Sequence, residues 1–202
     1  MSDGVGRAYD ARAAEYVGLA GAMEQMSDAD RGLVGGWADA TTGRLLDAGS
    51  GPGHWTGFLH DRGHDVVGID LSEQFVAHAR EQHPQIDFLH GSFDKLPLPE
   101  ASLGGILAWY SLIHTPPEEL PAILAEFARV LAPGGSLLTG FFDGPPREPF
   151  AHAVTTAYFW TTDALTEMLE SAGFRVTASE SRPRAPGEIS SRPHASVTAA
   201  RR

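Results

Sequence analysis

Three glycines and one aspartate have the types and spacing needed to hold an adenosine-containing ligand. Gly49, Gly51 and Gly53 follow a short apolar run, and a second apolar run ends at Asp70, 21 residues after Gly49 (70 − 49). In a first βαβ unit, such glycines let the backbone approach the ligand, and an acid after the second strand accepts hydrogen bonds from the ribose hydroxyls. The alternative for Asp70 is a helix cap ahead of Ser72.

The glycine spacing separates classes of nucleotide ligand. The dinucleotide fingerprint G-x-G-x-x-G requires a glycine at position 54, where this chain has His54. No lysine follows the glycines, as one does in a P-loop. We therefore expect a nucleoside that carries no phosphate chain.

The elements that must position these residues alternate between strand-like and helix-like patterns. A continuous apolar run at 104–109 is typical of a strand covered on both faces. Alternation of this kind predicts a mainly parallel sheet with helices on both sides. The predicted strands are 44–48, 65–69, 86–89, 104–109, 136–142 and 174–178. The predicted helices are 54–61, 72–82, one that opens at Thr115-Pro116 and ends before Pro133, and one that is capped by Thr162 and ended by Gly173.

The composition fits one α/β domain. The chain has 202 residues, of which 42% are hydrophobic, enough to bury a full core. No apolar run approaches the roughly 20 residues of a membrane span, and the first residues lack a basic-then-apolar signal. With no cysteine there is also no disulfide framework. We expect a cytoplasmic protein that does not contact a membrane.

Charge and histidine spacing exclude two kinds of partner. The formal net charge is −11 and Lys95 is the only lysine, which opposes a nucleic-acid binder because phosphate contacts need clustered basic side chains. The histidines have no tight spacing, so we expect no metal site.

Three motifs in order give the chain a resemblance to a known family. They are Leu46–Gly53, Val67–Ser72 and Val130–Gly135. Over roughly residues 40 to 180 the chain resembles the class I S-adenosylmethionine-dependent methyltransferases of the small-molecule type. The resemblance implies S-adenosylmethionine as cofactor and S-adenosylhomocysteine as product. It also implies transfer of a methyl group to an O, N or C atom of a small acceptor, such as a natural product or metabolite.

The same resemblance implies a single-domain Rossmann-like methyltransferase fold. Its sheet has seven mostly parallel strands with helices on both faces. We expect residues 1–40 to form a helical cover over the cofactor and residues 41–202 to form the core. A seventh, antiparallel strand is expected near 194–199, after a loop at 182–187. The alternative is a disordered tail after Ser181, where Pro, Ser, Arg and Ala dominate.

The family pattern extends to individual cofactor contacts. Members usually carry an acid directly after the glycine at position 91 to bind the adenine amino group, whereas this chain has Ser92, which puts that contact in doubt. Tyr9 and Tyr16 are seven apart and are expected on one face of an N-terminal helix. The residues expected to bind the cofactor are Tyr16, Asp47, Gly49, Ser50, Gly51, Gly53, Trp55, Asp70, Leu71, Ser92, Phe93, Trp109 and Tyr110.

His114 is the candidate catalytic and substrate-binding residue. It follows the fourth predicted strand, and its pKa range suits removal of a proton from a hydroxyl or amine. The alternative is a histidine that packs at the Thr115-Pro116 turn. His152 and Tyr158 follow a Pro-rich loop and are candidate substrate contacts, although that segment could also be an ordinary crossover.

Two other functions remain open. An NAD-dependent oxidoreductase could use a similar sheet, and the absence of glycine at position 54 argues against it. A non-catalytic cofactor-binding protein on the same fold is also compatible with the departure at Ser92. We expect a small-molecule substrate and a monomer or homodimer.

Overall fold

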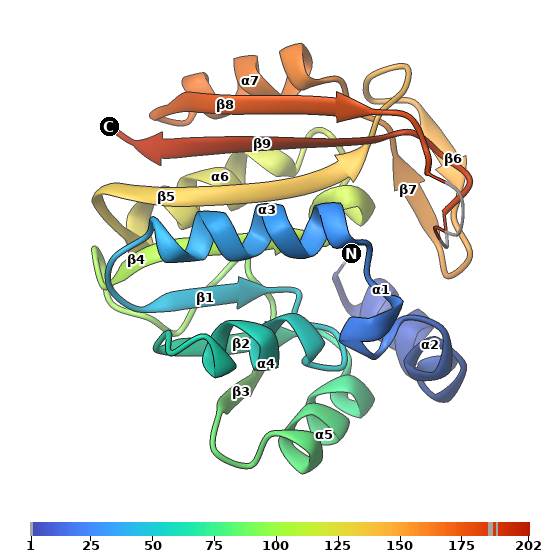
Figure 1. Cartoon of the computed structure of the whole chain (residues 1–202). Coiled ribbons are helices and arrows are strands. Elements are labelled where there is room, and N and C mark those ends of the chain that lie inside the picture. Colours follow the sequence, from blue (N-terminus) through green and yellow to red (C-terminus); the bar gives the residue numbers. More distant parts are fainter. Residues whose placement is uncertain (1, 186–187, 189) are drawn as a thin grey trace.

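A seven-stranded sheet forms the centre of the molecule. The computed structural model describes residues 2–185, 188 and 190–202. The strand order is β3-β2-β1-β4-β5-β9-β8, and the first five strands in that order run parallel (Figure 1). Strand bounds are β1 Leu45–Ala48, β2 Val66–Asp70, β3 Asp87–His90, β4 Leu103–Trp109, β5 Leu131–Phe142, β8 Phe174–Arg182 and β9 His194–Arg201.

The predicted fold class is confirmed, including the antiparallel strand at the end of the chain. β9 pairs antiparallel with β5 on one side and with β8 on the other. Residues 194–199 therefore belong to a strand rather than a tail. Of the loop expected at 182–187, Pro186 and Gly187 lie outside the described residues.

Successive strand residues face opposite sides of the sheet, and this alternation builds two cores. Leu45 packs with Leu107 and Leu138 under α3 (Asp28–Asp39) and α4 (His54–Asp61). Leu46, by contrast, belongs to the larger core under α6 (Leu120–Val130) and α7 (Thr162–Ser171). Figure 1 shows α3 in front of the sheet and α6 behind it. Both sheet faces are covered, as the apolar β4 run predicts.

Helix caps in the structure agree with the sequence at one position and differ at two others. Ser72 caps α5 (Glu73–Gln82) by accepting a hydrogen bond from the Phe75 amide. The predicted cap at Thr162 was wrong, because the Thr161 side chain accepts from the Ala164 amide. The predicted start at Thr115-Pro116 was also wrong. A 3₁₀ turn, η2 (Leu112–His114), comes first, and α6 begins at Leu120.

The fifth strand is longer than predicted. It begins at Leu131 and runs through the Pro133-Gly134-Gly135 segment that was expected to separate helix and strand. The register with β4 shifts here, from Leu103 opposite Leu131 to Gly105 opposite Ser136. This irregularity absorbs the extra residues, with Gly134 at a φ of +78°.

Two short helices and a hairpin lie beyond the carboxyl ends of the parallel strands. The helices are α1 (Ser2–Asp10) and α2 (Ala13–Ala20), and the hairpin pairs β6 (Pro149–Ala151) with β7 (Thr156–Tyr158). The two helices and the hairpin lie at the same end of the sheet in Figure 1. The prediction that Tyr9 and Tyr16 share one helix was wrong, since the chain breaks between α1 and α2. Their rings nevertheless meet edge-on, with centroids 5.6 Å apart.

The rest of the N-terminal segment packs on the sheet. After the 3₁₀ turn η1 (Met23–Gln25), α3 buries Val34 and Trp37 against β1 and its neighbours. Of the first 40 residues, α1 and α2 therefore lie beyond the strand ends, whereas α3 packs on one face of the sheet. Among the described residues, no helix is both long and apolar enough to cross a membrane.

Candidate cofactor and acceptor site

The glycine turn after β1 brings its backbone to the edge of a cavity. Gly49 has a φ of +79°, and a Cβ there would lie 2.3 Å from the Cβ of Ser111. Gly51 has a φ of +54°, but a Cβ there would enter open space. Both conformations favour glycine. The first glycine thus packs against the turn after β4, and the second leaves room that a side chain would fill.

Asp70 is held in place by the same turn. One carboxylate oxygen accepts a hydrogen bond from the Gly51 amide at 2.8 Å, and the other accepts from the Ser72 amide at 2.8 Å. Burial raises the pKa of Asp70 to about 6, and the two backbone hydrogen bonds oppose that rise. Asp70 therefore both fixes the turn and lines the adjoining cavity.

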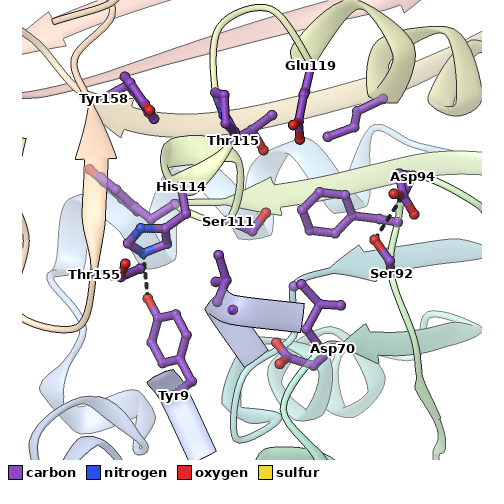
Figure 2. A pocket seen from close by; sticks show the side chains of 18 of the residues that line it. Tyr9, Asp70, Ser92, Asp94, Ser111, His114, Thr115, Glu119, Thr155 and Tyr158 are labelled. Atoms are coloured by element: carbon purple, nitrogen blue, oxygen red, sulfur yellow. Dashed lines mark hydrogen bonds between the residues drawn. The ribbon is translucent and has the colours of Figure 1, made fainter. Parts of the chain in front are cut away.

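The first cavity has a volume of about 810 Å³ and extends along the strand ends. Its lining comes from α1, the glycine turn, the ends of β2, β3 and β4, and the hairpin. Figure 2 shows Asp70, Ser92 and Ser111 on its walls. The lining includes Val5, Tyr9, Tyr16, Gly49, Gly51, Asp70, Leu71, Phe75, Ser92, Phe93, Asp94, Trp109, Tyr110, Ser111, His114, Glu119, Thr155 and Tyr158.

One end of the first cavity has the flat apolar walls that a base requires. Leu71 and the buried ring of Phe93 line it, together with Ser92 and the exposed Asp94. The Asp94 amide donates a hydrogen bond to Ser92 Oγ at 3.4 Å (Figure 2), a long distance that makes this a weak hydrogen bond. The serine that replaces the usual acid thus faces the cavity and can accept or donate one hydrogen bond.

His114 lies buried on the opposite wall, with both ring nitrogens engaged. Nδ1 is 2.8 Å from the Thr156 carbonyl oxygen, and Nε2 is 2.8 Å from the Tyr9 hydroxyl (Figure 2). A carbonyl only accepts, so Nδ1 carries the proton and Tyr9 donates to Nε2. Burial lowers the pKa of His114. The ring is therefore neutral at pH 7, and its basic nitrogen is shared with Tyr9.

A second cavity of about 350 Å³ shares the glycine turn with the first. It continues toward the hairpin, where His152 lines it with a pKa that burial lowers to about 4. The imidazole of His152 stands edge-on to that of His114, with centroids 5.1 Å apart. Ser50 and Trp55 are further wall residues. The two histidines thus face different cavities across one aromatic contact.

Two of the residues expected to bind the cofactor line neither cavity. Asp47 lies fully buried and accepts a hydrogen bond from Thr56 Oγ1 at 2.7 Å, and burial raises its pKa to about 7. Gly53 caps α4, and a Cβ there would lie 2.8 Å from the Cβ of Ala79. Both residues therefore pack against neighbouring helices and stabilise the glycine turn without lining a cavity. The other predicted site residues line one cavity or both.

Sequence reasoning missed several polar residues on these walls. Tyr9 was considered only for its helix face, and its hydrogen bond to His114 spans 105 residues. Ser111 Oγ is buried at the first cavity and has no hydrogen-bond partner among the described residues. Glu188 and His194 reach the second cavity from the end of the chain. No sequence signal pairs residues this far apart.

Comparisons with known proteins agree with this arrangement. A family model described as a methyltransferase domain matches residues 45–135, which run from β1 into β5. A probable S-adenosylmethionine-dependent methyltransferase of Mycolicibacterium smegmatis is 35% identical over 138 residues, covering 65% of this chain and 52% of the relative. The chain thus spans about half the length of this curated relative.

Solved structures share the fold. The [4+2]-cyclase SpnF superposes with a TM-score of 0.82 at 21% identity, covering 100% of this chain and 97% of that one. A Burkholderia thailandensis 1,6-didemethyltoxoflavin-N1-methyltransferase with bound S-adenosylhomocysteine has a TM-score of 0.71 at 24% identity, covering 86% of this chain and 77% of that one. The family-model match and the Mycolicibacterium smegmatis relative show that residues 45–135 are similar to S-adenosylmethionine-dependent methyltransferases, and the solved structures show that the chain shares their fold.

Proposed function

We propose that this protein transfers a methyl group from S-adenosylmethionine to a small-molecule acceptor. The observation that carries the proposal is the first cavity, whose wall contains the open glycine turn, the Asp70 carboxylate and the neutral His114. A nucleoside end and a reacting end are thus available in one continuous space of about 810 Å³. Of the activities named for the two solved neighbours described above, N1-methylation of 1,6-didemethyltoxoflavin fits this arrangement.

The described residues fit the cofactor in three respects. Gly51 leaves open the space that any side chain would fill, so a ligand can approach the backbone. Asp70 keeps carboxylate lone pairs beyond its two backbone hydrogen bonds and can accept from ribose hydroxyls. Ser111 lines the same cavity, and its buried Oγ has no hydrogen-bond partner among these residues.

The chain's own residues contribute positioning and proton handling. The cofactor, when bound, supplies a methyl group already activated on a sulfonium. The protein must then align the acceptor, exclude water and accept a proton if the acceptor carries one. α1 covers the strand ends and is tied down at Asp10, which accepts hydrogen bonds from Ser72 Oγ and the Gln74 amide. Through Tyr9 the same helix reaches His114, which has a basic ring nitrogen.

Calorimetric titration tests the cofactor class. We expect S-adenosylhomocysteine to bind and NAD to give no heat. Binding of NAD instead would support the oxidoreductase alternative and overturn the proposal. Methyl transfer from radiolabelled S-adenosylmethionine to a panel of phenols, amines, thiols and carbon acids then tests activity. Cofactor binding with no transfer to any acceptor would favour the non-catalytic alternative.

A further inference from the structure

A second set of polar side chains follows the wall of the second cavity, away from His114. Tyr110 directly follows β4, His194 is the first residue of β9, and Glu188 lies in the segment before β9. The Tyr110 hydroxyl is hydrogen-bonded to His194 Nδ1. His194 Nε2 lies 3.4 Å from Glu188 Oε2, an ion-pair distance. These three residues, the relay residues, form one continuous chain of contacts.

The hydrogen-bonding chemistry of the three side chains indicates where their protons lie. His194 Nε2 makes no hydrogen bond among the described residues but stands 3.4 Å from the Glu188 carboxylate, and a carboxylate only accepts, which favours the tautomer with the ring proton on Nε2. The other ring nitrogen then accepts, and Tyr110 donates its hydroxyl proton to it. This is the arrangement of a hydroxyl, a base and an orienting carboxylate that activates nucleophiles in many enzymes. The lone pairs of the Tyr110 oxygen remain available to a cavity ligand.

The charges around the relay keep Glu188 ionised. Its Oε1 lies 2.6 Å from Arg182 Nη1, and Arg182 also reaches Asp30 at 2.9 Å. Burial alone would raise the pKa of Glu188, but the Ala185 amide and Arg182 lower it overall. Burial lowers the pKa of His194 and raises that of Tyr110. At rest, therefore, the imidazole is neutral and the phenol keeps its proton.

The backbone at Tyr110 is held in an uncommon conformation. Its φ is +55°, one of three positive values among the described non-glycine residues. A bulky residue rarely adopts this conformation without a compensating contact. Here the ring packs against Trp109, Phe142 and the His194 imidazole, with centroids 5.0 to 5.6 Å apart. The fold thus directs the Tyr110 side chain to His194 despite local strain.

The remaining walls of the second cavity are mixed. The apolar side chains are Leu19, Met26, Trp55, Trp109, Ile113 and Phe142, and the charged ones are Arg12, Glu15, Asp30 and Arg192. A pocket of this kind suits a small apolar or aromatic ligand that carries a few polar atoms. Because Tyr110 lines both cavities, a polar atom of such a ligand can meet it next to the cofactor space.

We propose that the second cavity binds an apolar acceptor with a hydroxyl group, of the phenol or enol class, and that Tyr110, His194 and Glu188 take up its proton during methylation. The inference rests on the proposed function and adds the acceptor class and a proton path to it. A hydroxyl must lose its proton to become a good nucleophile, whereas a neutral amine or a thiolate does not need this help before attack.

The step balances in atoms and charge. The acceptor O–CH₃ bond forms as the S–CH₃ bond breaks, and the electron pair of the broken bond stays on sulfur. The acceptor proton passes to the Tyr110 oxygen while the Tyr110 proton passes to His194 Nδ1. One positive charge leaves the sulfonium and one appears on the imidazole, where Glu188 faces it. Solvent later removes the extra proton.

Two acceptors of different acidity test the relay in the full-length protein. At about pH 8, 2-naphthol is still protonated, whereas 4-nitrophenol is largely ionised and needs no base. Tyr110→Phe should lower kcat/KM for 2-naphthol by about 10²-fold or more and for 4-nitrophenol by less than about tenfold. Glu188→Gln should show the same selectivity with a smaller loss. The matched control is Glu170→Gln, which removes the charge of an exposed glutamate on α7.

Equal losses for the two acceptors would mean that Tyr110 only supports the site, and would overturn the relay. Normal turnover of 2-naphthol by Tyr110→Phe would do so as well. Transfer to amines or thiols but to no phenol would overturn the acceptor class while leaving the proposed function intact. No transfer to any acceptor, with S-adenosylhomocysteine still bound, would overturn the proposed function itself.

A binding measurement checks the inference without turnover. Calorimetry should show 2-naphthol binding to the protein loaded with S-adenosylhomocysteine. Tyr110→Phe should weaken that binding by about 3- to 10-fold, the loss expected for one hydrogen bond, and Glu170→Gln should leave it unchanged. Absence of 2-naphthol binding to the wild-type protein would contradict the assignment of this cavity.

Discussion

The two ends of the site are built in opposite ways. The cofactor segment, residues 45–94, contributes the glycine turn, Asp70 and the Ser92 turn from one continuous stretch of chain. The acceptor wall is formed by Tyr9, Tyr110, His114, His152 and His194, which come from α1, the end of β4, η2, the hairpin and β9. One end is local in sequence, whereas the other exists only after the whole sheet has formed.

This difference predicts two kinds of mutational effect. Cofactor recognition depends on backbone shape and one carboxylate, so changes in the cofactor segment should alter affinity for S-adenosylhomocysteine. The acceptor wall holds its polar groups through long-range hydrogen bonds, such as Tyr9 to His114. Changes there should lower turnover and leave cofactor affinity nearly unaltered. The predictions below test this separation, starting with the largest expected effect.

His114 is the rival base to the relay residues: if His114 rather than the relay takes the acceptor proton, His114→Ala should lower kcat by about 10²–10⁴-fold, the range of general acid–base catalysis. The reason is that the only basic ring nitrogen of His114 is lost from the wall of the first cavity. Steady-state kinetics with a saturating acceptor measures the effect, and calorimetry should show S-adenosylhomocysteine affinity within about threefold of wild type. A destabilised variant with full turnover per folded molecule would restrict His114 to holding α1 and β7 together.

Gly51→Val should weaken S-adenosylhomocysteine binding by about 100-fold or more, which is about 2.7 kcal/mol. A Cβ at this position would meet no protein atom within 4 Å, so the side chain would enter space that is open toward the cofactor. Gly63→Val is a matched control, because Gly63 also has a positive φ and open space but lies outside both cavities. Both variants should lose similar thermal stability. Normal affinity in Gly51→Val would mean that the glycine turn does not face the cofactor.

Asp70→Ala should weaken S-adenosylhomocysteine binding by about 1–3 kcal/mol, since it removes a charged hydrogen-bond acceptor. Some stability should also be lost, because the carboxylate fixes the Gly51 and Ser72 amides. Calorimetry and thermal unfolding separate the two effects. Asp61→Ala, at the exposed end of α4, should change neither. Unchanged affinity with a normal melting transition would leave Asp70 as a helix cap alone.

The affinity of wild-type protein for S-adenosylhomocysteine should fall as the pH drops through about 6. Asp70 has its pKa raised to about 6, so acid protonates it and removes the acceptor. At one pH unit below that value the loss should be at most about tenfold. The Asp70→Ala variant should show a flat profile over this range. The same pH dependence in that variant would assign the titration to another group.

Ser92→Asp should tighten S-adenosylhomocysteine binding by about 2- to 10-fold, the gain of roughly one hydrogen bond. The change restores the acid that family members usually carry after this glycine, at a position that lines the first cavity. Ser92→Ala is the comparison that measures what the native hydroxyl contributes. Weaker binding in Ser92→Asp would indicate that the adenine amino group lies elsewhere.

The sequence alone predicted the features that depend on neighbouring residues. α4 (54–61) has its predicted bounds, and Ser72 caps α5 as expected. The mainly parallel sheet followed from the alternation, and the antiparallel β9 from the family resemblance. These features follow local rules, such as capping chemistry, glycine at a positive φ and apolar runs under two covered faces.

Only the tertiary structure decided which polar groups meet. The Tyr9 hydroxyl reaches His114 across 105 residues, and Tyr110 reaches His194 across 84. The break between α1 and α2 and the late start of α6 at Leu120 were not predicted either. The Tyr9–His114 and Tyr110–His194 pairs have no periodic or spacing signal in the sequence, because their partners approach only once the sheet has brought the strand ends together. Residues near in sequence therefore specified the cofactor segment, whereas chain topology specified the acceptor wall.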